Sequence, residues 1–167
     1  YVLGVNQGLA LSSSPYVILS NNDVVIYPGA VDELIQVANL KPEFGLVNPN
    51  SNEFGFSKYD AGKLENLKGT WRERCHISGF FALVKREVIA KIGCYDPVYS
   101  PGYFEEMDFS ERAKRAGFLS IVANGAYVYH YGSRSFLPKE KQAAWDKNRV
   151  IFNKRWEIGR ASCRERV

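Results

Sequence analysis

The chain of 167 residues is 46% hydrophobic and 14% aromatic, which suffices for one globular core and is short for two domains. Its net charge of +4 is spread along the sequence without a block of Lys or Arg, which disfavours a nucleic-acid partner. No apolar run approaches the roughly 18 residues of a membrane span, and we expect no signal peptide.

The first part of the sequence alternates predicted helices with predicted strands. Apolar residues at near-helical spacing predict a helix over Val2–Leu11, and a strand follows over Tyr16–Leu19. Pro28 suits the first turn of a second helix. "FGLVNP" predicts another short strand, and a polar loop follows over residues 50–58.

The second part continues the alternation. The predicted elements are a strand in "HISGFFALVKR", a helix in "REVIAKIG" that ends at Gly93, a helix over Phe104–Ala116, two strands over Leu119–Val122 and Ala126–His130, and a helix over Pro138–Trp156. Strands interleaved with helices indicate an α/β layered domain with a mainly parallel sheet.

The triplet Asn21-Asn22-Asp23 ends the first predicted strand, in "LSNNDVVIYPG". Ligand sites of such sheets collect at the carboxyl ends of the strands. Asn21 and Asp23 lie on the same side of an extended chain, and such oxygen ligands suit Mg²⁺ or Mn²⁺ carrying a diphosphate. The alternative is that the triplet only caps the turn before Pro28.

"GYFEEMDFSERAKRAG" places Glu105, Glu106 and Asp108 at the start of a helix, where the helix dipole favours anions. Asp108 can pair with Arg112 four residues later, which leaves Glu106 without an obvious local partner. A carboxylate in that position, beside other acids, can have its pKa raised toward the range of a general base. The alternative is a solvated acidic helix cap.

"VYHYGSRS" ends an apolar strand with His130, and Arg134 follows shortly after. The imidazole can be a nitrogen ligand of Mn²⁺ or a histidine of the core. Arg134 can hold a phosphate oxygen or lie on the surface as an ordinary arginine.

Together with "ISGFFALVKREVIAKIGCYDPVY", these motifs resemble, in order and spacing, the inverting family-two glycosyltransferases, in particular rhamnosyltransferase-like and O-antigen or cell-wall members. The resemblance covers almost all of residues 1–156. It implies a layered GT-A fold and a bacterial enzyme of polysaccharide biosynthesis. Such an enzyme moves a sugar from a nucleotide-diphosphate donor to a glycan or lipid-linked acceptor, with inversion in one metal-assisted displacement.

The resemblance also assigns roles to residues. It makes Asp23 and His130 ligands of the divalent cation, with Asn21 a departure from the usual aspartate, so metal affinity should be lower. It makes Glu106, beside Glu105, the counterpart of the catalytic base. The donor and acceptor contacts that it implies are Asn22, Gly79, Phe80, Asp108 and Arg134, whereas Asp96 and Arg112 would be structural. We therefore expect Asp23, Glu106 and His130 to converge around one cation and one sugar.

Both ends of the chain look artificial. Tyr1 already lies inside an apolar pattern, and the resemblance implies nucleotide-binding strands before it. Residues 157–167, "EIGRASCRERV", match the translation of a common sequencing adapter. We expect a partial glycosyltransferase domain over residues 1–156 and a non-native tail over residues 157–167.

Other interpretations stay open. A nucleotidyltransferase also binds a metal diphosphate at a strand end, and a catalytically silent sugar-binding module would tolerate Asn21 and a glutamate at 106. Trp145, Phe152 and Trp156 of the last helix can contact a membrane that carries the acceptor, or pack against the domain. Cysteines 75, 94 and 163 have no metal-type spacing, which indicates a reducing cytoplasm, with the inner membrane face as a variant.

Overall fold

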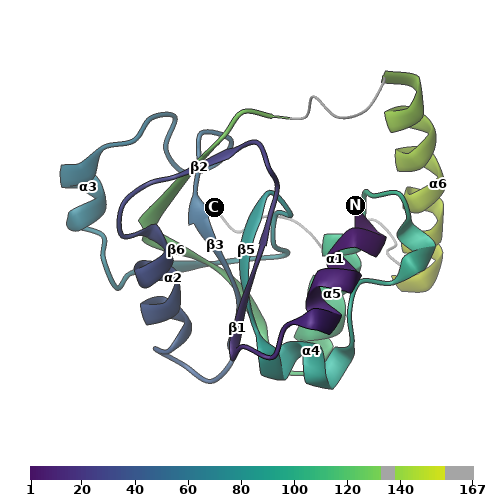
Figure 1. The fold of residues 1–167 in the computed structure, drawn as a ribbon, viewed down its shortest axis with the longest axis horizontal. Helices are drawn as coiled ribbons and strands as arrows, with labels where there is room; N and C mark the ends of the chain where they lie inside the picture. Colours follow the sequence, from purple (N-terminus) through teal and green to yellow (C-terminus); the bar gives the residue numbers. More distant parts are fainter. Residues whose placement is uncertain (133–137, 157–167) are drawn as a thin grey trace.

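The computed structural model of the chain describes residues 1–132 and 138–156 (Figure 1). The elements in chain order are α1 (Val2–Leu11), β1 (Tyr16–Ser20), β2 (Val24–Ile26), α2 (Ala30–Ala38), β3 (Phe44–Asn50), α3 (Ala61–Glu65), β4 (Trp71–Arg74), β5 (Phe81–Lys85), α4 (Arg86–Ile92), the 3₁₀-helix η1 (Pro97–Tyr99), α5 (Glu105–Arg115), β6 (Leu119–His130) and α6 (Pro138–Trp156). The predicted tail, Arg134 and Cys163 lie outside the described residues.

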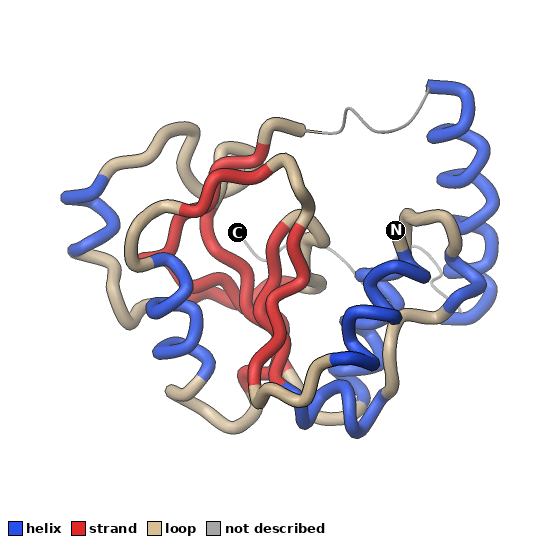
Figure 2. The backbone as a smooth tube through the Cα atoms, in the orientation of Figure 1, coloured by secondary structure: helices blue, strands red, loops and turns tan. Residues whose placement is uncertain are grey.

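A mixed sheet of six strands forms the centre of the molecule (Figure 2). Its order is β1-β5-β3-β6-β2, with β4 paired to β6. Helices α2 and α3 lie on one side of the sheet, and α1, α4, α5 and α6 lie on the other (Figure 1). The layered α/β arrangement that the sequence predicted is confirmed.

The expectation of a mainly parallel sheet is wrong for the described strands. Only β3 and β6 pair in parallel, and the pairings β1–β5, β3–β5, β2–β6 and β4–β6 are antiparallel. The reason is that β5 inserts between β1 and β3 and runs opposite to both. Since β1, β3 and β6 nevertheless point the same way, their carboxyl ends meet at one edge of the sheet.

The observed elements differ from the predicted ones in three further places. The two strands predicted near the C-terminus are one strand, β6. The strand predicted in "HISGFFALVKR" covers only Phe81–Lys85. Residues 24–26, which follow the polar triplet, form the unpredicted strand β2, and the segment between residues 60 and 75 contains α3 and β4. These short elements carry no clear periodicity, and the two strands are defined by their pairing with β6.

Two hydrophobic clusters cover the two faces of the sheet. One contains Leu34 and Val37 of α2, packed with Val47 and Leu83 of the sheet. The other joins the opposite face to the remaining helices and contains Val2, Leu46, Val84, Val88 and Phe109. Because successive side chains of a strand point to opposite faces of the sheet, the neighbours Leu46 and Val47 of β3 belong to different clusters. Burial of such a side chain stabilises the fold by about 1.5–3 kcal/mol.

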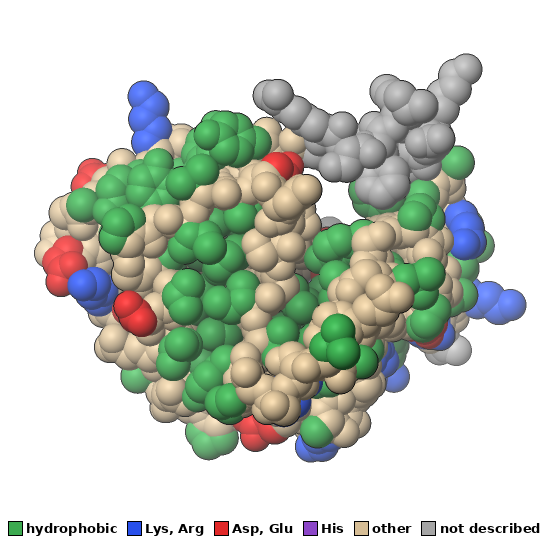
Figure 3. Space-filling model, viewed as in Figure 1, with side chains coloured by type: hydrophobic (Ala, Val, Ile, Leu, Met, Phe, Trp, Pro, Cys, Tyr) green, Lys and Arg blue, Asp and Glu red, His purple; other side chains and the backbone are tan. Residues whose placement is uncertain are grey.

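The aromatic side chains of α6 pack onto the domain. The ring of Phe104 lies 5.6 Å from that of Trp145 and 5.5 Å from that of Phe152, between centroids. Trp156 donates a hydrogen bond to Asp108. These contacts support the packing interpretation of the helix. On the face shown in Figure 3, hydrophobic side chains gather over the sheet, whereas charged side chains lie mainly toward the margins.

The described helices include none that combines the length and apolar character of a membrane span. Cys75 and Cys94 are free thiols.

Candidate active site

A cavity of about 550 Å³ opens where the carboxyl ends of β1 and β6 meet the start of α5. Its lining residues are Tyr1, Ser20, Asn21, Asn22, Asp23, Ser78, Gly79, Phe80, Gly102, Tyr103, Glu105, Glu106 and His130. Eight of the ten residues that the sequence placed in the site therefore line one cavity. Asp108 does not, and Arg134 lies outside the described residues.

Asp23 and His130 lie at the same edge of the sheet because β2 pairs antiparallel with the end of β6. In this register Val24 lies opposite His130, and Tyr131 donates its backbone N–H to the carbonyl of Asp23 at 3.0 Å. Oδ1 of Asp23 consequently lies 3.2 Å from Nε2 of His130. Nδ2 of Asn21 lies 3.5 Å from the same nitrogen. The three predicted metal ligands thus share one corner of the cavity.

Groups from other parts of the chain hold the backbone of His130, its Nδ1 and one face of its ring. Its Nδ1 lies 2.8 Å from Oε1 of Glu53, and Asn52 forms two hydrogen bonds with its backbone. Phe80 stacks on the imidazole, with the ring centroids 5.0 Å apart and the planes at 18°. Glu53 and Asn52 were not singled out in the sequence. They belong to the polar loop after β3, and only the common strand direction brings that loop to this edge.

The corner formed by Asp23 and His130 fits a divalent cation. A neutral imidazole that donates from Nδ1 to the carboxylate of Glu53 would offer Nε2 as a ligand on the side of Asp23. Apart from this nitrogen, the buried Oδ1 of Asp23 has no hydrogen-bonding partner among the described residues. One carboxylate oxygen and one imidazole nitrogen suit Mn²⁺. Within residues 1–132 and 138–156, no group of three His, Cys, Asp or Glu side chains is placed to hold a metal, so this set is a partial one.

Glu105 and Glu106 occupy the first turn of α5 and both face the cavity. Glu105 is only 4% exposed, whereas Glu106 is half-buried. Burial and, after it, the charge of Glu106 raise the pKa of Glu105 to about 9. Glu105 therefore keeps its proton at neutral pH. Glu106 is left as the candidate proton acceptor of the pair.

Gly79 brings the chain close to this acid pair. A Cβ atom at position 79 would lie 3.4 Å from Oε1 of Glu106 and 3.2 Å from the hydroxyl of Tyr1. That hydroxyl donates to the carbonyl of Gly79 at 2.9 Å. Burial, followed by the charges of Glu106 and Glu105, raises the pKa of Tyr1, so the phenol stays protonated. Tyr1 is a cavity residue that the sequence patterns did not indicate.

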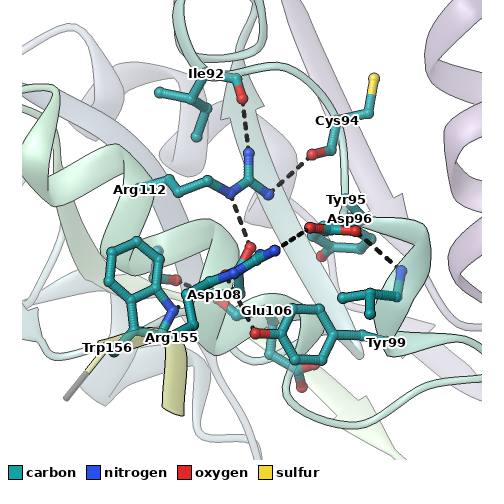
Figure 4. Close-up of polar contacts among 12 residues, drawn as sticks. Ile92, Cys94, Tyr95, Asp96, Tyr99, Glu106, Asp108, Arg112, Arg155 and Trp156 are labelled. Atoms are coloured by element: carbon teal, nitrogen blue, oxygen red, sulfur yellow. Dashed lines mark hydrogen bonds and ion pairs between the residues drawn. The ribbon is translucent and has the colours of Figure 1, made fainter. Parts of the chain in front are cut away.

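Asp108 is fully buried outside the cavity, in a network that joins α5 to α6 (Figure 4). Its carboxylate accepts from Arg112 at 2.8 Å, from Arg155 at 2.9 Å and from Trp156 at 3.1 Å. The donor or acceptor contact expected of Asp108 is therefore corrected to a structural one, because α6 covers this turn of α5. Its pairing with Arg112 is confirmed. Asp96 joins the network through Arg155 at 2.7 Å, in keeping with its expected structural role.

Comparison with known proteins relates the chain to glycosyltransferases in sequence and in fold. No family model matches the chain. The chain is similar to N-acetylglucosaminyl-diphospho-decaprenol L-rhamnosyltransferase from two strains of Mycobacterium tuberculosis, with 26% identity over 82% of this chain and 54% of the relative. The chain thus spans about half the length of these curated relatives. The resemblance to rhamnosyltransferase-like glycosyltransferases is confirmed.

Solved structures that share the fold include GalNAc-T7 and the mannosyltransferase PcManGT. GalNAc-T7, solved with UDP, GalNAc and Mn²⁺, superposes with a TM-score of 0.63 at 12% identity, over 77% of this chain and 30% of its own. The mannosyltransferase PcManGT from Pyrobaculum calidifontis, solved with GDP-Man and Mn²⁺, superposes with a TM-score of 0.61 at 15% identity. The match covers 97% of this chain and 45% of the mannosyltransferase chain. The chain therefore has the GT-A fold of nucleotide-sugar transferases, as the motifs predicted.

Proposed function

We propose that the protein containing this chain is a glycosyltransferase that moves a sugar from a nucleotide-diphosphate donor to an acceptor hydroxyl, with inversion. The observation that carries the proposal is the convergence of Asp23, His130 and Glu106 on one cavity. Asp23 lies in the bend between β1 and β2, His130 ends β6 and Glu106 lies in the first turn of α5, so the sheet register and α5 hold the three residues there. The rhamnosyltransferase relatives and the GT-A fold support the same reaction class.

Asp23 and His130 would hold a divalent cation, with the side chain of Asn21 beside them. Such a cation, when bound, neutralises the negative charge that develops on the departing diphosphate. Glu53 fixes the histidine so that Nε2 faces the cation site. An amide at position 21 contributes no charge, and binding should be weaker than in a site with two aspartates. Both structural neighbours were solved with Mn²⁺, which supports this ion over Mg²⁺.

Glu106 would act as the general base. Its carboxylate takes the proton from the acceptor hydroxyl while the hydroxyl oxygen attacks the anomeric carbon and the bond to the diphosphate oxygen breaks. Attack from the face opposite the leaving group inverts the anomeric configuration without a covalent enzyme intermediate. Glu105, which stays neutral, adds no second negative charge beside the base. A side chain at position 79 would crowd Glu106, so the glycine keeps this part of the cavity clear.

The acceptor class is proposed from the relatives. Their name specifies a lipid-linked N-acetylglucosamine diphosphate as the molecule that receives rhamnose. A glycan on a polyprenyl diphosphate is therefore the acceptor that we propose to test first. Contact between the protein and a membrane, and its location in the cytoplasm, stay predictions.

The test uses the longest natural chain that contains these residues, with Mn²⁺, a panel of nucleotide-diphosphate sugars and a lipid-linked acceptor. We expect a glycosylated product whose anomeric configuration, read by NMR, is opposite to that of the donor. Retention of configuration would overturn the single displacement. Release of inorganic pyrophosphate from a nucleoside triphosphate and a sugar phosphate would indicate a nucleotidyltransferase, and binding without turnover would indicate a silent module.

A further inference from the structure

The segment between η1 and α5 forms one wall of the cavity in an unusual backbone conformation. Gly102 and Tyr103 line the cavity, and α5 begins two residues after Tyr103. Tyr103 and Phe104 have φ angles of 75° and 71°, in the left-handed region. Residues with a side chain rarely adopt this region because Cβ then crowds the backbone. The start of α5 must therefore be held by contacts from elsewhere in the chain.

Asn148 of α6 provides such contacts. It is fully buried, and its Nδ2 donates to three carbonyls of the segment, those of Tyr99 at 2.7 Å, Gly102 at 2.7 Å and Tyr103 at 3.0 Å. The Nδ2 atom carries only two hydrogens, so the three carbonyl oxygens share these two donors and must all point at the same nitrogen. This convergence defines the path of the turn and pairs three backbone carbonyls with one buried donor group.

Two other contacts fasten α6 to the same region. The ring of Phe104 packs against Trp145 and Phe152, which precede and follow Asn148 in the sequence. Arg155 pairs with Asp108, one turn into α5 (Figure 4). Helix α6 thus contacts the turn before the two glutamates and the helical turn after them.

We propose that Asn148 is a positioning residue, which holds the left-handed turn at Tyr103 and Phe104 so that Glu105 and Glu106 face the cavity. Asn148 is not among the residues that line the cavity, and its side-chain hydrogen bonds go to backbone carbonyls and to neither acid. It acts through the backbone that leads into α5. This inference rests on the proposed function for its effect on turnover, but its effect on the acid pair is independent of any activity.

The test compares Asn148→Ala with Asn153→Ala, an exposed asparagine on the same helix. The first readout is the titration of Glu105, followed by NMR of glutamate labelled with ¹³C at the carboxyl carbon and assigned with Glu105→Gln. We expect its midpoint in Asn148→Ala to fall by about one pH unit or more, because a displaced helix start exposes Glu105 to water and separates it from Glu106. Asn153→Ala should titrate as the unsubstituted protein does.

The second readout is turnover per folded molecule in the longest natural chain containing these residues. We expect kcat in Asn148→Ala to fall about ten- to hundred-fold, with the dissociation constant of the donor changed less than about two-fold. A residue that only stabilises the fold would lower the folded fraction and leave both readouts unchanged. Asn148→Ser, which keeps one hydrogen-bond donor, should give a Glu105 midpoint and a kcat between those of the unsubstituted protein and Asn148→Ala. If Asn148→Ala does not fold, the same two measurements on Asn148→Ser test the proposal.

The outcomes separate the two proposals. An unchanged Glu105 titration in the folded variant overturns the positioning role of Asn148. A shifted titration supports it, whatever the turnover. Full turnover in Glu106→Gln would overturn the proposed base and leave the positioning role to be judged by the titration alone.

Discussion

Oδ1 of Asp23 lies 3.2 Å from Nε2 of His130. His130 ends β6 and Asp23 lies in the bend between β1 and β2, and the pairing of β2 with β6 brings the two residues together. A divalent cation bound by both this oxygen and this nitrogen would stabilise their close approach. The metal predictions below follow from this contact.

Asp23→Asn should weaken the binding of Mn²⁺ by about ten- to hundred-fold, because it removes the one carboxylate of the proposed set. Binding of Mn²⁺ alone is measured by electron paramagnetic resonance of the free ion. Asp32→Asn, at an exposed aspartate in the first turn of α2, is the matched control and should bind as before. Equal affinity in the Asp23 variant would remove Asp23 from the metal site.

Asn21→Asp should have the opposite effect and tighten Mn²⁺ binding by about ten-fold, since it adds a charged oxygen ligand beside His130. The same titration measures it. Asn22→Asp, at the neighbouring residue that also lines the cavity, serves as the control for added charge. If both substitutions tighten binding equally, general electrostatics and not coordination by residue 21 explains the gain.

Glu106→Gln should lower kcat by a factor of about 100 to 10,000, which equals roughly 3 to 5 kcal/mol of transition-state stabilisation. Donor binding should change little, because the amide keeps the size of the side chain. Steady-state kinetics and calorimetry with the donor measure the two quantities. The control is Glu111→Gln, farther along α5 and away from the cavity. Turnover within a few-fold of the unsubstituted protein would exclude Glu106 as the base.

The pKa of Glu105, raised from 4.5 to about 9, makes stability depend on pH. Between these values the native state keeps a proton that the unfolded state has lost, so the free energy of unfolding falls as the pH rises. The titratable groups around Glu105 are Glu106 and three tyrosines, Tyr1, Tyr95 and Tyr103. Burial raises the pKa of each phenol, so the tyrosines carry no charge in this pH range.

Glu105→Gln removes this titration. Relative to the unsubstituted protein it should gain about 1 to 3 kcal/mol of unfolding free energy at pH 8, and less at pH 5. Urea unfolding at the two pH values measures the difference. An equal change at both values would show that Glu105 does not hold its proton in the native state.

Asp108→Asn should destabilise the fold by about 2 to 4 kcal/mol, because Arg112 and Arg155 lose a fully buried charge partner. Arg155 is 37% exposed, so water offsets part of its loss. Urea unfolding is the measurement, with Asp146→Asn, in an exposed pair with Arg149, as the control. A loss no larger than that of the control would show that the network contributes little to stability.

The sequence by itself determined the types of most elements and the chemistry available at their ends. Local signals sufficed for these elements. Helical spacing and the glycine at 93 predicted α1, α4 and α5, and short apolar runs predicted β1 and β3. The polar residues after β1, the acids opening α5 and the histidine ending β6 were recognisable because each interrupts or ends such a pattern. Their order along the chain also pointed to the GT-A fold.

Only the tertiary structure decided which of these residues meet. The antiparallel insertion of β5, the pairing of β2 and the placement of Asp108 away from the cavity depend on packing between segments far apart in the chain. The same holds for the support that Glu53 gives to His130 and Asn148 gives to the start of α5. Periodicity records which face of an element is buried, but not which partner buries it, and that choice is made by the assembled core.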